Sequence, residues 1–220
     1  MKVLVIAPHP DDEILGCGAT MARFAKEGHE VYVAILTKAG PPLFSVAQVE
    51  QGRKEALLAH HLLGVKETFF RDLPAAELDR VAHAEVNQVI GALIKEIQPE
   101  MVFIPFIGDI HLDHQSISLS SLVAMRPNQW AYPTKICAYE TLSETNWNAP
   151  FLTPRFQPNL FIDVSEFLAL KLQAFSLHQS QVKAFPHERS LKALEALAIL
   201  RGSTVHRHAA EAFVVIREVL

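Results

Sequence analysis

The sequence predicts an α/β fold in which a mostly parallel sheet is flanked by helices. Short apolar runs rich in β-branched residues alternate with longer segments of helical periodicity along most of the chain. The first run, residues 3–6, is continuous in the way that is typical of a strand buried on both faces of a parallel sheet. The chain has 220 residues, 50% of them hydrophobic, and no linker-like stretch, so we expect one compact domain spanning residues 1–220.

Six apolar runs are expected to form strands, and the periodic segments between most of them are expected to form helices. The strands are expected over residues 3–6, 31–36, 101–107, 135–139, 160–164 and 212–216. The helices are expected over residues 13–26, 46–64, 79–98, 164–182 and 188–201, with a further helix after residue 114. Residues 128–158 are rich in proline and predict a long irregular excursion beside one strand, of the kind that often shapes a pocket.

Composition excludes several classes of partner and location. The formal net charge is −4 and the basic residues are scattered, so a nucleic-acid partner is not expected. No stretch approaches the roughly 20 apolar residues that span a bilayer, and the first apolar run is too short for a signal peptide. With no export signal and only Cys17 and Cys137, we expect a cytoplasmic protein without a disulfide framework, although one bridge between these two cysteines stays open.

Two polar motifs follow predicted strands, where open α/β sheets bind their ligands. The first, PHPDDE at residues 8–13, comes directly after the first strand and opens a helix. Proline and carboxylates at these positions also suit plain helix capping. Capping does not explain the imidazole of His9, which places a nitrogen ligand beside two carboxylates.

The second motif, GDIHLDH at residues 108–114, follows the predicted strand over residues 101–107 and precedes another helix. Taken alone, it could be an ordinary polar loop. Together the two motifs offer histidine nitrogen and carboxylate oxygen from separate segments, which is a common way to bind a first-row metal while leaving one position open for water.

The stretch APHPDDEILGCG at residues 7–18, together with HLDH at residues 111–114, resembles the LmbE/PIG-L family of zinc-dependent N-deacetylases. Shorter stretches along most of the chain are also similar to bacterial members, at residues 53–56, 126–127, 139–141, 158–159, 180–181, 201–202 and 210–213. The resemblance implies a Rossmann-like three-layer sandwich with its site at the carboxyl ends of the strands. It also implies a hydrolase that removes the N-acetyl group from an N-acetylglucosamine-type sugar or glycoside, and a homo-oligomer.

The resemblance also implies roles for individual residues. The residues that match the zinc ligands are His9, Asp12 and His114. Asp11 matches the general base that activates water, and His111 matches a residue that assists the oxyanion or the leaving group, as an imidazolium with Asp113 as its orienting partner. Some members carry a tyrosine where this chain has Asp109, so a tyrosine contribution to oxyanion binding is not assumed. The expected cofactor is Zn²⁺ or another divalent transition metal such as Fe²⁺.

Two other functional classes stay open at this stage. Paired aspartates can hold a divalent cation near phosphates, as in a metal-dependent phosphoester hydrolase or glycosyl transferase. The motifs could also be relics in a non-catalytic α/β ligand-binding module. Two histidines favour zinc over magnesium, and the presence of the general base Asp11 argues against a relic.

Arg53 opens a helix and could reach the crevice from a neighbouring strand end, and the resemblance favours substrate contact over a solvated helix charge. His60 and His61 share that helical pattern, so we expect ordinary helix residues rather than metal ligands. Cys17 lies between two glycines, where close helix packing is a simpler explanation than thiol chemistry.

Overall fold

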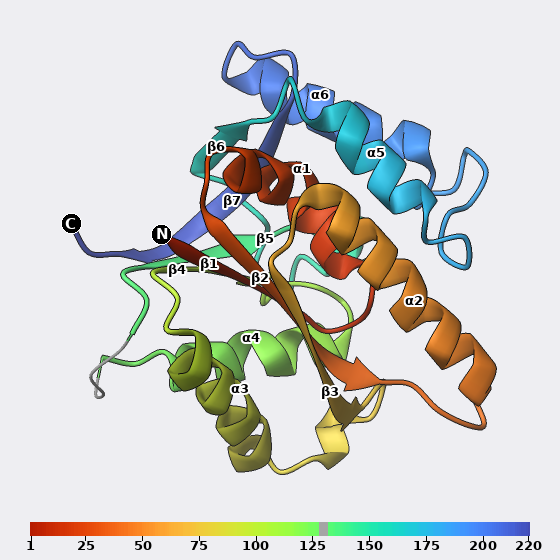
Figure 1. Ribbon diagram of the computed structural model, residues 1–220, viewed down its shortest axis with the longest axis vertical. Coiled ribbons are helices and arrows are strands. Elements are labelled where there is room, and N and C mark those ends of the chain that lie inside the picture. Colours follow the sequence, from red (N-terminus) through yellow and green to blue (C-terminus); the bar gives the residue numbers. More distant parts are fainter. Residues whose placement is uncertain (128–131) are drawn as a thin grey trace.

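The computed structural model describes residues 1–127 and 132–220. Within these ranges a seven-stranded sheet carries helices on both faces, which confirms the predicted α/β fold (Figure 1). The spatial order is β3-β2-β1-β4-β5-β7-β6; β1 to β5 are parallel, whereas β7 runs antiparallel to β5 and β6. The strands are β1 (Lys2–Ala7), β2 (Glu30–Lys38), β3 (Glu67–Pro74), β4 (Met101–Pro105), β5 (Lys135–Tyr139), β6 (Leu160–Asp163) and β7 (Ala210–Glu218).

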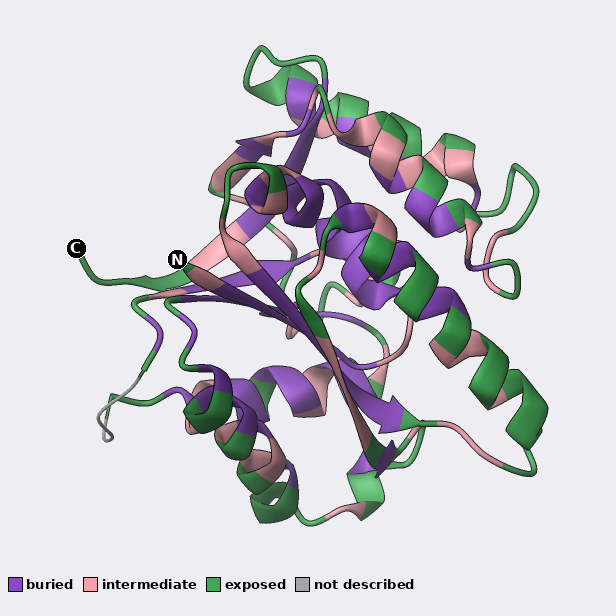
Figure 2. Ribbon diagram, in the orientation of Figure 1, coloured by how far each residue is buried: buried purple, intermediate pink, exposed green. Residues whose placement is uncertain are grey.

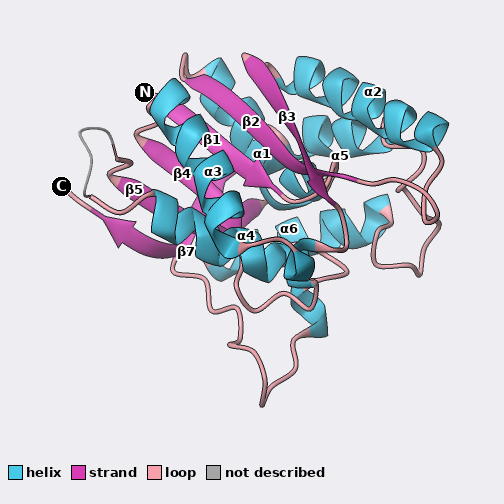
Figure 3. Cartoon of the chain, turned by 90° about the horizontal axis from the view of Figure 1, so that it is seen from below, coloured by secondary structure: helices cyan, strands magenta, loops and turns pink. Residues whose placement is uncertain are grey.

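The helices form two layers around the sheet, with the helices of each layer in contact with one another (Figure 1). In the view from below, α3 and α4 lie in front of the strands (Figure 3). One layer consists of α1 (Asp12–Lys26), α2 (Val46–Leu63), α5 (Leu168–Ser176) and α6 (Leu191–Thr204). The other consists of α3 (His83–Ile97) and α4 (Leu112–Ala124). Two short 3₁₀ turns, Leu78–Arg80 and Thr145–Trp147, lie in the connections.

Strand β1 shows why the central strands are continuous apolar runs. Val3 and Val5 point into the hydrophobic core beneath the first helix layer, while Leu4 and Ile6 point into the core beneath the second. All four side chains are at most 1% exposed, and the centre of the sheet is buried along its length (Figure 2). A strand with a helix layer on each face cannot place polar side chains on either, so the alternating pattern is absent.

Helix α2 begins and ends where local sequence signals place its ends. The Ser45 side chain accepts a hydrogen bond from the backbone of Gln48, and the Gln48 side chain accepts one from the Ser45 backbone, which forms a capping box. The helix ends at Gly64, whose φ of 75° suits glycine because it has no Cβ.

The structure also contains elements that differ from the prediction. Strand β3 was not predicted, because it lies at the sheet edge and only Leu73 among its residues is buried, so no apolar run marks it. The helix predicted over residues 164–182 is the shorter α5, and the chain after it contacts Asp11, which follows β1, through Arg189. The excursion predicted over residues 128–158 includes a 3₁₀ turn, whereas β5 within it is the strand expected over residues 135–139; residues 128–131 lie outside the described part.

Two further expectations concern membranes and disulfides. Among the described residues there is no helix with the length and apolar character needed to cross a membrane. Cys17 and Cys137 are buried as free thiols, so the possible bridge between them is not formed.

Candidate active site

Both polar motifs lie at the same edge of the sheet because the strands that precede them are neighbours. Strand β1 pairs in parallel with β4; the first motif follows β1, and the second connects β4 to α4. The ring centroids of His9 and His114 are 5.4 Å apart. Two segments that are far apart in the sequence therefore form one site.

The three predicted metal ligands converge on one point. Nδ1 of His9 lies 3.1 Å from Oδ2 of Asp12, and Nε2 of His114 lies 3.2 Å from the same oxygen. One potential ligand atom from each residue lies within 4.8 Å of the other two. Asp12 and His114 are buried and His9 is partly exposed, so the group opens to solvent on one side.

The unpaired polar atoms of this group fit a metal ion. Oδ1 of Asp12 and Nε2 of His114 are buried and form no hydrogen bond with any described residue. The 3.2 Å contact between Nε2 of His114 and Oδ2 of Asp12 does not have the geometry of a hydrogen bond. Buried polar atoms without partners are costly, and a cation between them would satisfy both. Two imidazole nitrogens and one carboxylate oxygen are a common donor set for zinc, with one position left open.

Two further carboxylates orient the histidines of this group. Nε2 of His9 lies 3.0 Å from Oδ2 of Asp113, and Nδ1 of His114 lies 2.8 Å from Oδ2 of Asp109. Each carboxylate accepts a hydrogen bond from one ring nitrogen, Nε2 of His9 or Nδ1 of His114. The other ring nitrogen, Nδ1 of His9 or Nε2 of His114, faces Asp12 and is free to bind metal. Asp109, known from sequence only as a departure from the family pattern, thus contacts a predicted ligand directly.

The contacts of Asp113 and His111 differ from those expected from the sequence. The carboxylate of Asp113 accepts hydrogen bonds from His9 and from the backbone N–H of Ala76 at 2.6 Å. His111 instead accepts the backbone N–H of Asp113 at its Nδ1, at 3.1 Å, and so caps α4. The expected orienting contact from this carboxylate to the His111 ring is not formed, because the carboxylate is turned towards His9.

The surroundings of His111 favour its neutral form. Burial, together with the nearby rings of His9 and His114, lowers the pKa of His111 to about 4. Because Nδ1 accepts a hydrogen bond, the neutral ring carries its proton on Nε2. The imidazolium expected from the sequence therefore does not fit these surroundings.

Asp11 lies beside the predicted ligands but is held by different partners. Its Oδ2 accepts a hydrogen bond from Nη1 of Arg189 at 2.7 Å, and its backbone N–H donates to Glu13. Burial raises the pKa of Asp11 to about 7, against the opposing effect of Arg189. A carboxylate with this pKa is suited to accept a proton near neutral pH.

Arg189 is a site residue that the sequence did not reveal. It lies between α5 and α6, and it also donates to the Ser143 hydroxyl at 2.7 Å and to the Gln181 side chain at 2.9 Å. Arg189 therefore connects Asp11 to the segment after β5 and to the segment after α5. A lone arginine in a loop carries no sequence signal for such a contact.

Arg53, the residue predicted to contact substrate, binds to residues of the edge strand β3. Its Nη2 donates to Oδ1 of Asp72 at 2.5 Å and to the carbonyl of Arg71 at 3.1 Å, and its guanidinium lies over the ring of Phe70. A contact between Arg53 and substrate therefore remains a prediction.

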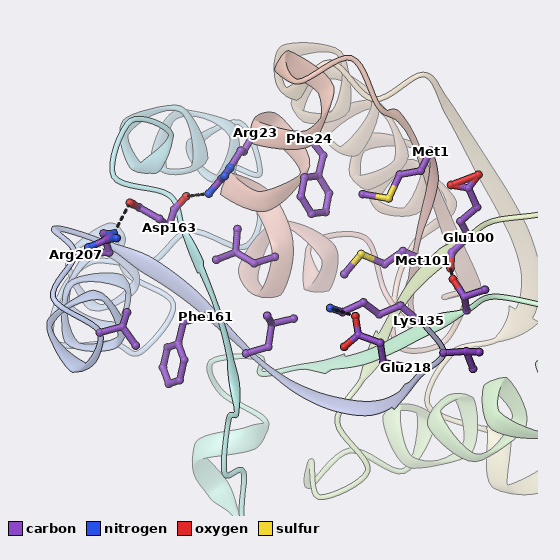
Figure 4. Close-up of a pocket in the computed structure, with 15 residues that line it drawn as sticks. Met1, Arg23, Phe24, Glu100, Met101, Lys135, Phe161, Asp163, Arg207 and Glu218 are labelled. Carbon is purple, nitrogen blue, oxygen red and sulfur yellow. Dashed lines mark hydrogen bonds and ion pairs between the residues drawn. The ribbon is translucent and has the colours of Figure 1, made fainter.

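A pocket of about 860 Å³ lies at the opposite end of the strands, far from this chemistry (Figure 4). It is lined by Met1 and by residues at the beginning of β4 and β5. Four of its charged side chains already pair with one another: Lys135 with Glu218, and Arg207 with Asp163. These pairs leave little capacity to recognise a charged ligand, so the metal-ligand group defines the candidate site.

Comparison with known proteins agrees with the geometry. The chain is 31% identical to an uncharacterised deacetylase of Escherichia coli (strain K12), over 81% of this chain and 90% of that protein. It is 26% identical to the diacetylchitobiose deacetylase of Thermococcus kodakarensis, over 94% of this chain and 80% of that protein. Its fold matches the crystal structure of a conserved protein from Thermus thermophilus, with a TM-score of 0.80, 26% identity, and coverage of 99% and 96% of the two chains.

The sequence profile of the PIG-L family, described as GlcNAc-PI de-N-acetylase, matches residues 4–125, which is more than half of the chain and includes both motifs. The chain therefore belongs to the PIG-L family of de-N-acetylases, as the resemblance of its two motifs predicted.

Proposed function

We propose that this protein is a zinc-dependent N-deacetylase that removes the acetyl group from an N-acetylglucosamine-type sugar or glycoside. The observation that carries the proposal is the group of His9, Asp12 and His114, with the separately held carboxylate of Asp11 beside it. Zinc held by this group would polarise the acetyl carbonyl and lower the pKa of the attacking water to roughly 7.

Asp11 is the proposed general base. Its pKa near 7 allows it to accept a proton from the attacking water, and the carboxylic acid so formed can return that proton to the departing amine nitrogen. Arg189 holds one oxygen of this carboxylate and leaves the other for the water. One residue therefore handles both proton transfers of amide hydrolysis.

His111 is the proposed stabiliser of the oxyanion. In its neutral form the ring carries its proton on Nε2, and its centroid lies 4.7 Å from that of His9. A neutral N–H aimed at the developing negative charge stabilises the transition state more than the ground state. Asp113 acts in this scheme on His9, where it fixes the orientation of the ring.

The substrate class rests on the relatives, one of which is named for deacetylation of diacetylchitobiose. We include Arg53 as a candidate for contact with the sugar, at the edge of the sheet beyond β3. Fe²⁺ is an alternative cofactor for the same donor set, and a cytoplasmic homo-oligomer remains the expected form.

The test is acetate release from a panel of N-acetylated compounds by protein of measured metal content. The panel contains N-acetylglucosamine, diacetylchitobiose and N-acetylglucosaminyl glycosides, each assayed after chelation and after reloading with Zn²⁺ or Fe²⁺. We expect about one metal ion per chain and acetate release that chelation abolishes and reloading restores.

Failure to release acetate from every compound at full metal loading would contradict the proposal. Hydrolysis of a phosphoester with Mg²⁺ in the same preparation would favour the alternative hydrolase. Ligand binding without any turnover would favour a binding module.

A further inference from the structure

The backbone of Asp11 adopts a conformation that L-residues rarely occupy. Its φ is 142° and its ψ is −26°. Such a conformation is strained and persists only where surrounding contacts hold it. Because the direction of a side chain follows from its backbone, this conformation decides where the carboxylate of Asp11 points.

A buried chain of hydrogen bonds leads to this backbone from two other elements. The N–H of Asp11 donates to Oε2 of Glu13 at 3.1 Å. The second oxygen, Oε1, lies 2.9 Å from Nε2 of His60 on α2, and Nδ1 of His60 lies 2.8 Å from the hydroxyl of Thr68 on β3. Glu13 is 0% exposed and His60 is 2% exposed.

A role in capping alone accounts for only part of this arrangement. An acidic residue in the first turn of α1 complements the helix dipole wherever it points. An exposed glutamate would do so without the cost of burying a carboxylate, which requires full pairing in a protein interior. Here the carboxylate is buried, and a histidine from a different helix pairs with it.

We infer that Glu13 and His60 are positioning residues that hold the general base Asp11 in its strained conformation and so aim its carboxylate. The inference rests on the proposed function, because it assigns these residues to the base of that reaction. One oxygen of Glu13 fixes the Asp11 N–H, and His60 fixes the other oxygen. For this role the length of the Glu13 side chain matters more than its charge, because the length lets it contact both the Asp11 N–H and His60.

Two substitutions of Glu13 distinguish the effect of its side-chain length from the effect of its charge. In Glu13→Gln the amide oxygen still accepts the Asp11 N–H, and the amide nitrogen donates to His60 in the tautomer protonated on Nδ1. In Glu13→Asp the charge and the helix-dipole interaction remain, but the side chain is one methylene shorter and falls short of the Asp11 N–H.

We expect kcat for acetate release to fall about 100-fold in Glu13→Asp, because a misplacement of the base by about 1 Å can cost about 100-fold in rate. In Glu13→Gln, which keeps the contact, kcat should fall less than about tenfold. KM should change less than about threefold, and metal content should stay at the wild-type value. The reverse order, with Asp more active than Gln, would overturn the inference in favour of an electrostatic role. Loss of metal in step with activity would overturn it in favour of a role in metal binding.

A second pair of variants tests the support from α2, and it serves also if Glu13→Asp does not fold. His60→Leu removes the partner of Glu13, whereas His61→Leu changes the next residue, which is exposed on the same helix. We expect kcat to fall at least about tenfold in His60→Leu with metal retained, and to be unchanged in His61→Leu. Equal kcat values in these two folded variants would overturn the inference.

A measurement without substrate distinguishes this inference from the proposed function. Crystal structures of the wild type and of Glu13→Asp should show Asp11 leaving its φ near 142° only in the variant. If the wild type released no acetate from any compound, the proposed function would fail, while this comparison would still test the positioning. An unchanged Asp11 backbone in the variant would overturn the positioning itself.

Discussion

Asp11 and Asp12 have the same side chain and adjacent places in the chain, yet their surroundings give them opposite properties. Burial raises the pKa of Asp11, and Arg189 only partly opposes it. Burial acts in the same direction on Asp12, but His114 and then His9 outweigh it and hold the pKa of Asp12 well below its usual range. Carboxylates whose pKa values are separated in this way are suited to different roles. Asp12 remains an anion, which suits its proposed role as a metal ligand, and Asp11 can exchange a proton.

This division predicts the effect of Asp11→Asn. The variant should keep its metal, because His9, Asp12 and His114 are unchanged, and should lose two or more orders of magnitude in kcat, as expected for loss of a positioned base. The measurement is kcat for acetate release beside metal content. Asp79→Asn changes an exposed aspartate and serves as the matched control. Near-normal turnover in Asp11→Asn would remove Asp11 from the reaction.

At the scale of single elements, buried polar contacts join helices and strands that are far apart in the sequence. Lys171 on α5 donates to Oε1 of Glu211 on β7 and to the carbonyl of Leu15 on α1. The carboxylate of Glu211 also accepts the backbone N–H groups of Ala19 and Thr20. Both charged side chains are at most 4% exposed. This ion pair therefore connects α1, α5 and β7 within the core.

Breaking this pair should be costly. Lys171→Met leaves the charge of Glu211 buried without its partner, so we expect the free energy of unfolding to fall by about 3–5 kcal/mol in urea titrations. Lys135→Met breaks the more exposed pair with Glu218 and should cost less than about 1 kcal/mol. The double variant Lys171→Met/Glu211→Gln should recover part of the loss. If Lys171→Met and Lys135→Met lowered the free energy of unfolding equally, burial of the Lys171–Glu211 pair would not matter for stability.

The elements themselves were predictable to different degrees. The signals for α2 were local: Ser45 with Gln48 at its beginning and Gly64 at its end. Strand β3 had no such signal, because an edge strand with mostly exposed side chains lacks the apolar run that marks a buried one. The antiparallel direction of β7 was likewise unpredictable, since the residues of a strand do not encode the direction of its neighbour.

At the scale of the whole molecule, the site joins the carboxyl end of β1 to the beginning of α4. At this junction Oδ1 of Asp12 and Nε2 of His114 are buried and accept no hydrogen bond from the residues that the structure describes. Zinc should therefore stabilise the entire fold as well as activate the site.

We expect chelation to lower the Tm and zinc to restore it, because a ligand that binds only the folded state stabilises it by about 4 kcal/mol at a concentration 1,000 times its Kd. His9→Ala should lose most of this zinc-dependent gain, since it removes one of the three proposed ligands. Differential scanning calorimetry with and without Zn²⁺ provides the measurement. A gain in His9→Ala equal to that of the wild type would show that His9 is not a ligand.

The sequence by itself determined the fold class, the family and the identity of the residues in the two motifs, because buried strands and clustered histidines and aspartates leave local patterns. The tertiary structure decided what each side chain touches: Asp113 turns to His9, Arg189 reaches Asp11, and Glu13 pairs with His60. Such contacts depend on which strands are neighbours and on how separate loops meet. They arise only when the chain is packed, so no local pattern can record them.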